Sequence, residues 1–412
     1  MRIGIRHSKM MRQVLPKAGL VLMGIILALM AAEGLLRLLP NSIGTPVGGS
    51  FYPQYSPLLG WERIPNAEGK LVLPEFTVSQ SFNSRGIRGP EYSYSKGENE
   101  YRILVLGDSI AEGYGVEFNE LFSEVLKGRL NSTGSEYYYE VITMGMSGYS
   151  TDQELLYYQY EGKKYCPDLT ILMFHENDVW LNTQSVVPGD FPYNKPLFIL
   201  KDGELELTNI PVPKFDSTMI HESFIQKVKG WFSGNSYLYN FVARKVTENP
   251  FLLSLAVKIG LVEDIYDENG FALVPDYLRV WEKVYSADIG YAWKVTEALV
   301  ITLRDEAVSI GSKLLVFNVP RKESFYLKDW EDTKKKYGIS EKDWNVDQAG
   351  VELGALCNRN EIDYINPTEI FQVKADSLAL EGKRLYYTYD GHWNATGHQV
   401  AGEILAQYIL EE

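Results

Sequence analysis

Residues 101–109 read Tyr-Arg-Ile-Leu-Val-Leu-Gly-Asp-Ser, a short apolar run that ends in a glycine, an acid and a serine. Four further apolar runs of strand length follow along the chain, at residues 141–144, 169–174, 313–319 and 362–365. They are rich in isoleucine, leucine and valine and do not alternate with polar residues, which is typical of parallel strands covered on both faces. We therefore expect five parallel strands.

Helical patterns lie between these runs and after the last one. They cover residues 121–130, 153–162, 292–310, 349–359 and 395–410. The alternation of strands and helices predicts an α/β fold, with a doubly wound parallel sheet covered by helices on both faces. Ligands bind such sheets in the crevice at the carboxyl ends of the strands, so the side chains that follow each strand are candidates for chemistry.

Residues suited to acyl transfer follow three of these strands and precede the last helix. Ser109 comes after the first strand, where the free amides at the start of a helix favour the negative charge that develops when a serine attacks a carbonyl. Gly148 follows the second strand and could supply a backbone N–H, and Asn177 follows the third and could supply a side-chain amide. Asp390 and His392 are two apart on a loop, so the carboxylate can orient the imidazole toward the serine.

These residues, in this order, resemble the motifs of the SGNH (GDSL) hydrolase family of serine esterases and acyltransferases. The resemblance implies a flavodoxin-like three-layer α/β/α sandwich with a five-stranded parallel sheet. It also implies a catalytic triad of Ser109, His392 and Asp390. The oxyanion hole would then be formed by Ser109, Gly148 and Asn177.

Two departures from the family pattern concern the site. His175 stands two residues before Asn177, where the family often has a glycine, which leaves the shape of the acyl pocket open. One residue separates Asp390 from His392, and Trp393 follows the histidine. This C-terminal block looks like that of membrane-anchored relatives associated with cell-surface polysaccharides.

Other roles for nearby residues stay open. Four residues are candidates for substrate contact: Asp108, His175, Asp178 and Trp393. His175 is also the alternative base for Ser109, but only His392 has an acid positioned to orient it. A metal site is a further alternative, since five side chains could meet at the crevice: His175, Glu176, Asp178, Asp390 and His392. That mixture selects no particular metal, and we expect neither a metal nor a cofactor.

The first forty residues predict a membrane anchor. Residues 1–17 are basic, and residues 18–39 would form roughly 33 Å of apolar helix, against a hydrocarbon core of about 30 Å. Glu33 and Arg37 interrupt the run at a spacing at which they can pair. The basic flank is expected to stay in the cytoplasm, which places the rest of the chain, after residue 40, outside it, in the periplasm or at the cell surface. The alternative is a cleaved signal peptide, because the uninterrupted apolar run is only 15 residues long.

Beyond the anchor we expect a linker and irregular extension at residues 40–100 and a hydrolase domain at 101–412. An insertion of about a hundred residues, at about 183–290, interrupts the domain after the third strand. Its patterns predict one hairpin and three helices, at 197–200 with 204–207 and within 217–233, 236–247 and 277–287. The insertion could form a lid or substrate wall, or it could only buttress the domain.

Charge and cysteine content exclude several classes of protein. The formal net charge is −14, and the chain after residue 40 is more acidic still, because the first forty residues hold six basic residues against one acid. So acidic a body would repel a phosphate backbone, and we expect no nucleic-acid partner. Cys166 and Cys357 are too few for a disulfide scaffold, and they form either one bridge or two free thiols.

Three functions from different classes follow from this reading. The first is an envelope-anchored serine esterase that removes O-acyl groups, acetyl above all, from a carbohydrate or cell-envelope glycan, so that its substrate is an acylated glycan or a small ester. The second is an O-acyltransferase that modifies an envelope polysaccharide and receives its acyl group from a membrane partner protein. The third is a non-catalytic glycan-binding scaffold, against which the complete set of Ser109, His392 and Asp390 argues.

Overall fold

The computed structural model describes residues 4–39, 46, 53–187, 193–215, 224–258, 261–262 and 271–411. The chain divides into two compact units, which are described separately. The larger unit comprises residues 50–71, 78–219 and 265–412, and the smaller unit comprises residues 1–49, 72–77 and 220–264.

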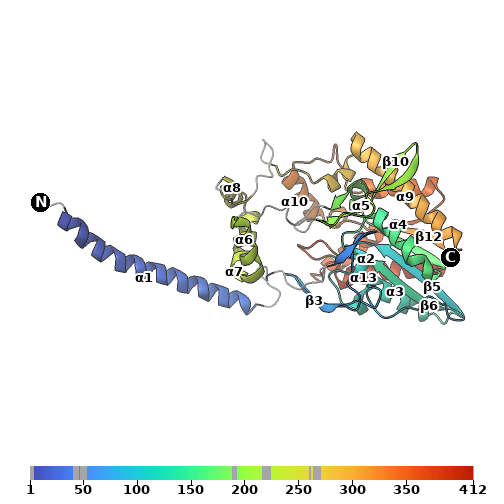
Figure 1. The fold of residues 1–412 in the computed structure, drawn as a ribbon, viewed down its shortest axis with the longest axis horizontal. Helices are drawn as coiled ribbons and strands as arrows, with labels where there is room; N and C mark the ends of the chain where they lie inside the picture. The colour runs from blue at the N-terminus through green and yellow to red at the C-terminus, as the bar shows by residue number, and fades with distance from the viewer. Residues whose placement is uncertain are drawn as a thin grey trace. The chain divides into compact units, whose positions relative to one another are not determined.

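A five-stranded parallel sheet forms the centre of the larger unit (Figure 1). Its strands are β5 (Glu100–Gly107), β6 (Tyr138–Gly145), β7 (Leu169–Phe174), β12 (Lys313–Asn318) and β13 (Asp363–Ile365). They lie in the order β13-β12-β7-β5-β6, and every neighbouring pair is parallel. Counted along the chain this is the flavodoxin-like order 2-1-3-4-5, with its switch point between the first and third strands. The predicted sheet is confirmed.

Helices cover both faces of this sheet because successive strand residues point to opposite sides. Ile103 and Val105 of β5 pack with α3 (Phe122–Asn131) and α13 (Ala395–Glu411). Leu104 and Leu106 pack on the other face with α4 (Thr151–Tyr160), α9 (Ala287–Ser309) and α11 (Gln348–Arg359). One buried cluster therefore lies on each face of the sheet, between the strands and the helices, which gives the predicted three layers of helices, sheet and helices. This unit also contains two helices that were not predicted from the sequence, α10 (Leu327–Tyr337) and α12 (Thr368–Ala379).

The segment before the first sheet strand is more ordered than the sequence predicted. It contains β1 (Gln54–Ser56) paired with β2 (Gly60–Glu62), and β3 (Glu68–Val72) paired with β4 (Thr77–Ser81). Strands of three to five residues carry too little periodicity to be recognised among turn residues. The predicted linker at 40–52 lies outside the described residues apart from Pro46.

The insertion contributes to both units. The predicted hairpin is present as β10 (Leu197–Lys201) and β11 (Glu204–Thr208), and it belongs to the larger unit. The smaller unit contains α6 (Phe224–Asn235), α7 (Tyr237–Glu248) and α8 (Pro250–Lys258), together with α1 (Gly4–Arg37). The helix expected within 277–287 is instead a 3₁₀ turn, Asp276–Trp281. Residues 216–223, which include the start of one predicted helix, lie outside the described residues.

One helix in the described part of the chain is long and apolar enough to cross a membrane. It spans Gly19–Arg37 with a mean hydropathy of 2.2. Length and composition fit a membrane anchor or a signal sequence equally well.

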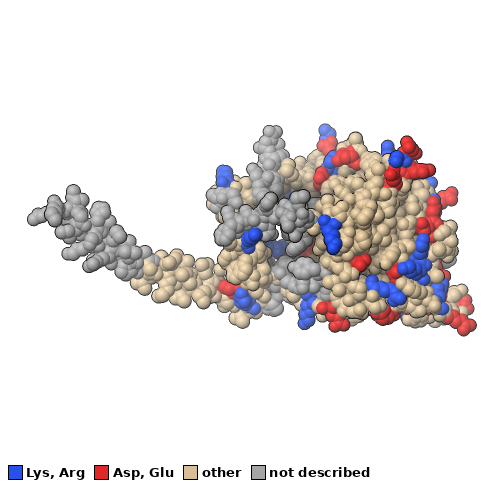
Figure 2. Space-filling view, in the orientation of Figure 1, with Lys and Arg blue, Asp and Glu red and all other residues tan. Residues whose placement is uncertain are grey.

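The charges on the surface and the state of the two cysteines can be compared with the expectations from the sequence. Acidic and basic side chains are interspersed over the face of the larger unit seen in Figure 2. Cys166 is exposed and Cys357 is buried, and both are free thiols. The alternative of a single disulfide is therefore excluded in this structure.

Candidate active site

Ser109 is the first residue of the short helix α2 (Ser109–Glu112), which follows β5 directly. Asp108 caps this helix, and its side chain accepts a hydrogen bond from the amide of Ile110 at 2.8 Å. At the end of the neighbouring strand, a Cβ on Gly145 would lie 2.2 Å from the amide nitrogen of Glu112. Only a glycine at this position lets the serine-bearing turn pack so closely on β6.

The structure brings Ser109, His392 and Asp390 together in one chain of contacts. His392 Nε2 lies 2.8 Å from Ser109 Oγ. The other ring nitrogen, Nδ1, contacts Asp390 Oδ1, and the backbone amide of His392 donates to the same oxygen at 3.3 Å. The Tyr114 ring lies beside the imidazole, with the ring centroids 4.8 Å apart. This is the arrangement in which a histidine takes the proton of a serine while a carboxylate holds its orientation.

Gly148 and Asn177 line the same pocket as Ser109, which has a volume of about 590 Å³. Gly148 has a φ of +83°, which favours glycine, in the turn between β6 and α4. Asn177 is the first residue of α5 (Asn177–Leu181), after β7. Its Oδ1 atom is buried and accepts no hydrogen bond from the described residues. All three predicted oxyanion-hole residues therefore reach one cavity.

A buried ion pair that the sequence did not reveal supports this turn. The Glu112 carboxylate accepts two hydrogen bonds from Arg63, at 2.6 and 2.7 Å, and one from the amide of Ser147 at 3.0 Å. Arg88 donates to the carbonyl oxygens of Glu112 and Gly113 at 2.9 and 2.6 Å. Burial raises the pKa of Glu112, but the charge and hydrogen bonds of Arg63, together with the Ser147 hydrogen bond and the Arg88 charge, lower it overall. The pair thus ties the extension before β5 to the loop that carries Gly148.

His175 forms a second acid–histidine pair in the pocket. Its Nδ1 atom lies 3.3 Å from Asp108 Oδ2. Burial would raise the pKa of Asp108, but the contact with His175 and the amide of Ile110 lower it instead. Of the two candidate bases, His392 is the one in contact with Ser109 Oγ. His175 and Asp108 both line the pocket, as expected for candidate substrate contacts.

Asp178 and Trp393 do not line the pocket. Asp178 is fully buried and accepts a hydrogen bond from Thr151 Oγ1 at 3.0 Å. Burial, followed by the nearby charge of Asp108, raises its pKa well above the usual range. Trp393 is also fully buried, among Phe122, Phe371 and other residues of the core. Neither side chain reaches the pocket, because Asp178 is enclosed and the Trp393 ring packs into the core beside His392.

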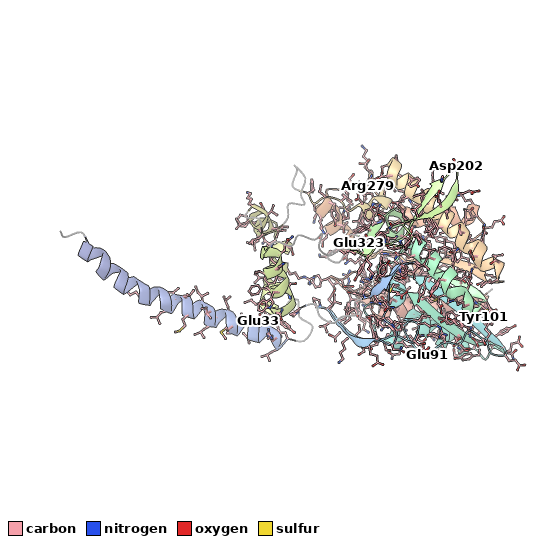
Figure 3. The ribbon with its side chains drawn as sticks, viewed as in Figure 1. Glu33, Glu91, Tyr101, Asp202, Arg279 and Glu323 are labelled. Carbon is pink, nitrogen blue, oxygen red and sulfur yellow. The ribbon has the colours of Figure 1, made fainter. Side chains whose placement is uncertain are left out.

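Three cations at the pocket were not predicted. Arg321 and Lys322 follow β12, and Lys336 belongs to α10. Arg321 Nε lies 3.3 Å from Glu176 and 3.4 Å from Glu323, which is labelled in Figure 3. Burial lowers the pKa of Arg321, but the nearby carboxylates of Glu323 and Glu176 raise it overall. The position of Arg321 just after the fourth predicted strand is the one signal that could have identified it.

The alternative metal site is not formed. No group of three or more histidine, cysteine or acidic side chains in the described ranges is arranged to hold a metal ion. In place of such a group, the acids divide among ion pairs. Asp390 contacts His392, Asp108 contacts His175, and Glu176 contacts Arg321.

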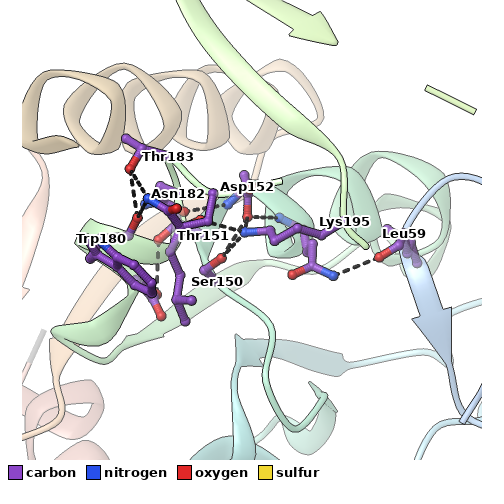
Figure 4. A network of polar contacts seen from close by, with 12 residues as sticks. Leu59, Ser150, Thr151, Asp152, Trp180, Asn182, Thr183 and Lys195 are labelled. Atoms are coloured by element: carbon purple, nitrogen blue, oxygen red, sulfur yellow. Dashed lines mark hydrogen bonds and ion pairs between the residues drawn. The ribbon is translucent and has the colours of Figure 1, made fainter. Parts of the chain in front are cut away.

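Behind the pocket a buried lysine holds the start of α4 (Figure 4). Lys195 Nζ donates to Ser150 Oγ at 2.5 Å, to Asp152 Oδ1 at 2.8 Å and to the carbonyl oxygen of Leu181 at 2.9 Å. The side chains of Lys195 and Asp152 are both 0% exposed. Ser150 occupies the N-cap position of α4, two residues after Gly148, and its side chain bonds Lys195 and Asp152. The network therefore joins the insertion, through Lys195, to the turn that carries an oxyanion-hole candidate.

Comparisons with known proteins give distant structural likeness. No protein-family model and no curated protein matches the sequence. Among solved structures, the chain is similar to a GDSL-like lipase from Bacteroides thetaiotaomicron, at 10% identity and a TM-score of 0.34 over 75% of this chain and 88% of that one. It is similar to a catalytic mutant of an acetylxylan esterase from Geobacillus stearothermophilus, at 12% identity and a TM-score of 0.36 over 76% and 93%. A lipase/acylhydrolase from Enterococcus faecalis matches at 9% identity and a TM-score of 0.38 over 75% and 95%. Likeness at this level does not assign a function, which is argued below from the site.

Proposed function

We propose that this chain is a serine esterase of the SGNH type, with Ser109 as nucleophile, His392 as base and Asp390 as the orienting acid. The observation that carries the proposal is the unbroken contact from Asp390 through His392 to Ser109 Oγ, at the wall of a pocket of about 590 Å³. A buried structural serine has no need of a histidine that is itself held by a carboxylate.

The reaction proceeds by acyl transfer through the serine. Ser109 Oγ attacks the ester carbonyl while His392 Nε2 accepts the hydroxyl proton, and Asp390 stabilises the resulting imidazolium. The developing oxyanion is held by the amides of Ser109 and Gly148 and by the side-chain amide of Asn177. His392 then donates its proton to the leaving alcohol. Water, deprotonated by the same histidine, hydrolyses the acyl-enzyme and releases the acid.

The substrate class that we propose is an O-acylated, and in particular O-acetylated, carbohydrate. The pocket wall combines polar, charged and aromatic side chains, among them Trp180, Tyr277 and Tyr389, whose flat rings suit sugar faces. We further propose that α1 is an uncleaved anchor and that the catalytic unit lies outside the cytoplasm, since the basic residues precede the apolar run.

The proposal is tested by hydrolysis of p-nitrophenyl acetate with the full chain in a mild detergent. Ser109→Ala should abolish turnover above background, whereas Ser135→Ala, at an exposed serine, should leave it unchanged. Equal rates in wild type and Ser109→Ala, with both proteins folded, would contradict the serine mechanism. Added glycan acceptors then separate two activities. Acyl transfer to the sugar in preference to water would identify an O-acyltransferase, for which we propose a membrane partner protein as the acyl donor.

A further inference from the structure

The charged pair in the apolar run of α1 has a partner within the smaller unit. Glu33, labelled in Figure 3, accepts hydrogen bonds from Ser236 Oγ and the amide of Leu238, each at 2.9 Å, and from the amide of Tyr237 at 3.2 Å. Arg37 donates to Glu33 at 2.8 Å and to the carbonyl oxygen of Asn235 at 2.9 Å. Glu33 therefore caps the first turn of α7, where the free amides favour a negative charge.

This contact places the insertion helices at the end of the apolar helix. Glu33 lies six residues before the end of the apolar run at residue 39, which is about 9 Å along a helix. This depth falls within the roughly 5–10 Å to which interfacial helices enter the boundary between headgroups and acyl chains. Leu35 and Leu38, on either side of Arg37, are exposed within this structure. The first turn of α7 thus lies at the depth of a membrane interface, if α1 crosses the membrane.

Two of the insertion helices carry exposed apolar stripes. On α6, Val228, Trp231 and Phe232 are spaced at i, i+3 and i+4, and Trp231 is 62% exposed. On α8, Phe251 and Leu255 are one turn apart, and Phe251 is 76% exposed. Helical residues at these spacings share one face. Large exposed aromatic and aliphatic side chains grouped in this way mark an interaction surface.

The charge of this segment is opposite to that of the whole chain. Residues 224–258 contain five basic residues and a single acid, Glu248, and the basic residues are Lys227, Lys229, Arg244, Lys245 and Lys258. Figure 2 shows lysine and arginine side chains over these helices. The formal net charge of the full chain is −14. Basic helices with exposed tryptophan and phenylalanine are typical of elements that lie in the interface of anionic bilayers.

We propose that α6–α8 form a lipid-binding element, docked on the outer end of α1 through Glu33, whose apolar stripes enter the interface of an anionic phospholipid bilayer. The continuity with an apolar helix and the local positive charge favour a lipid surface over a protein partner. The inference rests on the membrane anchor proposed above but not on the esterase activity. It assigns a role to the part of the insertion that does not line the pocket.

Tryptophan quenching by brominated phospholipids tests this placement. The full chain is reconstituted into vesicles of phosphatidylcholine and phosphatidylglycerol, with and without bromine on the acyl chains. Of eight tryptophans, Trp231 is the one within residues 1–49, 72–77 and 220–264. Trp231→Phe should reduce the quenched emission several-fold, whereas Trp344→Phe, in the larger unit, should leave it unchanged. Phe251→Trp should increase it.

The possible outcomes are distinguishable. Failure of the chain to float with the vesicles would overturn both the anchor and this inference. Flotation with no quenching in the wild type, or with quenching that Trp231→Phe leaves intact, would overturn the inference alone and would point to a protein partner for the stripes. Loss of esterase activity in Ser109→Ala has no bearing on either result.

Discussion

Removal of the buried lysine behind the pocket should destabilise the larger unit strongly. In Lys195→Met, Asp152 stays fully buried but loses its cation, while Ser150 and Leu181 lose hydrogen bonds from Nζ. Breaking one side of a buried ion pair costs about 3–5 kcal/mol. At roughly 2–4 °C per kcal/mol for a unit of this size, the melting temperature should fall by roughly 6–20 °C.

The assay is thermal unfolding of the full chain in detergent, followed by intrinsic fluorescence at pH 8 and pH 5. Burial already raises the pKa of Asp152 against the opposing charge of Lys195, and loss of the lysine should raise it further. The uncompensated carboxylate can then take up a proton at pH 5, so the loss should be smaller there than at pH 8. The double variant Lys195→Met with Asp152→Asn should recover much of the stability, because neither member of the pair is then charged.

The matched control is Lys201→Met in the same insertion. Lys201 pairs with Glu206 at 2.9 Å, but its side chain is 65% exposed, so the pair contributes less than about 1 kcal/mol to the free energy of unfolding. A fall in melting temperature no larger for Lys195→Met than for Lys201→Met would refute the reasoning. A double variant as unstable as Lys195→Met would also refute it.

Two further predictions concern the site itself. Asn177→Ala should lower kcat about 10²–10³-fold with little change in KM for p-nitrophenyl acetate, because it removes one oxyanion donor. A fall in kcat of less than tenfold, in a protein with an unchanged melting temperature, would exclude Asn177 from the oxyanion hole. The pKa of Asp108 is lowered in the folded protein. Its ionised form therefore stabilises the fold at pH values above the unfolded-state pKa of about 3.9, and this stabilisation is lost as the pH falls below about 4. The melting temperature of Asp108→Asn should therefore fall less steeply than that of the wild type from pH 5 to pH 3, and parallel curves would contradict this account of the Asp108–His175 contact.

The fold was predictable because its strands are buried on both faces. Each of the five apolar runs corresponds to a strand of the sheet, and residues that follow the first four of these strands line one pocket. The order of the blocks was enough to bring Ser109, Gly148, Asn177 and His392 to one pocket. Parallel topology thus converts sequence order into proximity.

What the sequence could not show depends on contacts between distant segments. Arg63 and Glu112 are 49 residues apart, and neither belongs to a recognisable motif. The burial of Lys195 could not be predicted, because a lysine between prolines and tyrosines is normally expected at the surface. Trp393 was a candidate for substrate contact because it follows His392, but adjacency in sequence does not determine the direction of a side chain, and its ring packs in the core. The division of the insertion between two units also has no local sequence marker.

The most direct test of the central claim is covalent labelling of the nucleophile. The full chain is incubated with a fluorophosphonate, which reacts with activated serines, and the modified residue is located by peptide mass spectrometry. The account predicts a single adduct on Ser109, which is lost in His392→Gln because no base remains to activate the hydroxyl. An adduct on another serine, or none on Ser109 in the folded wild type, would contradict it.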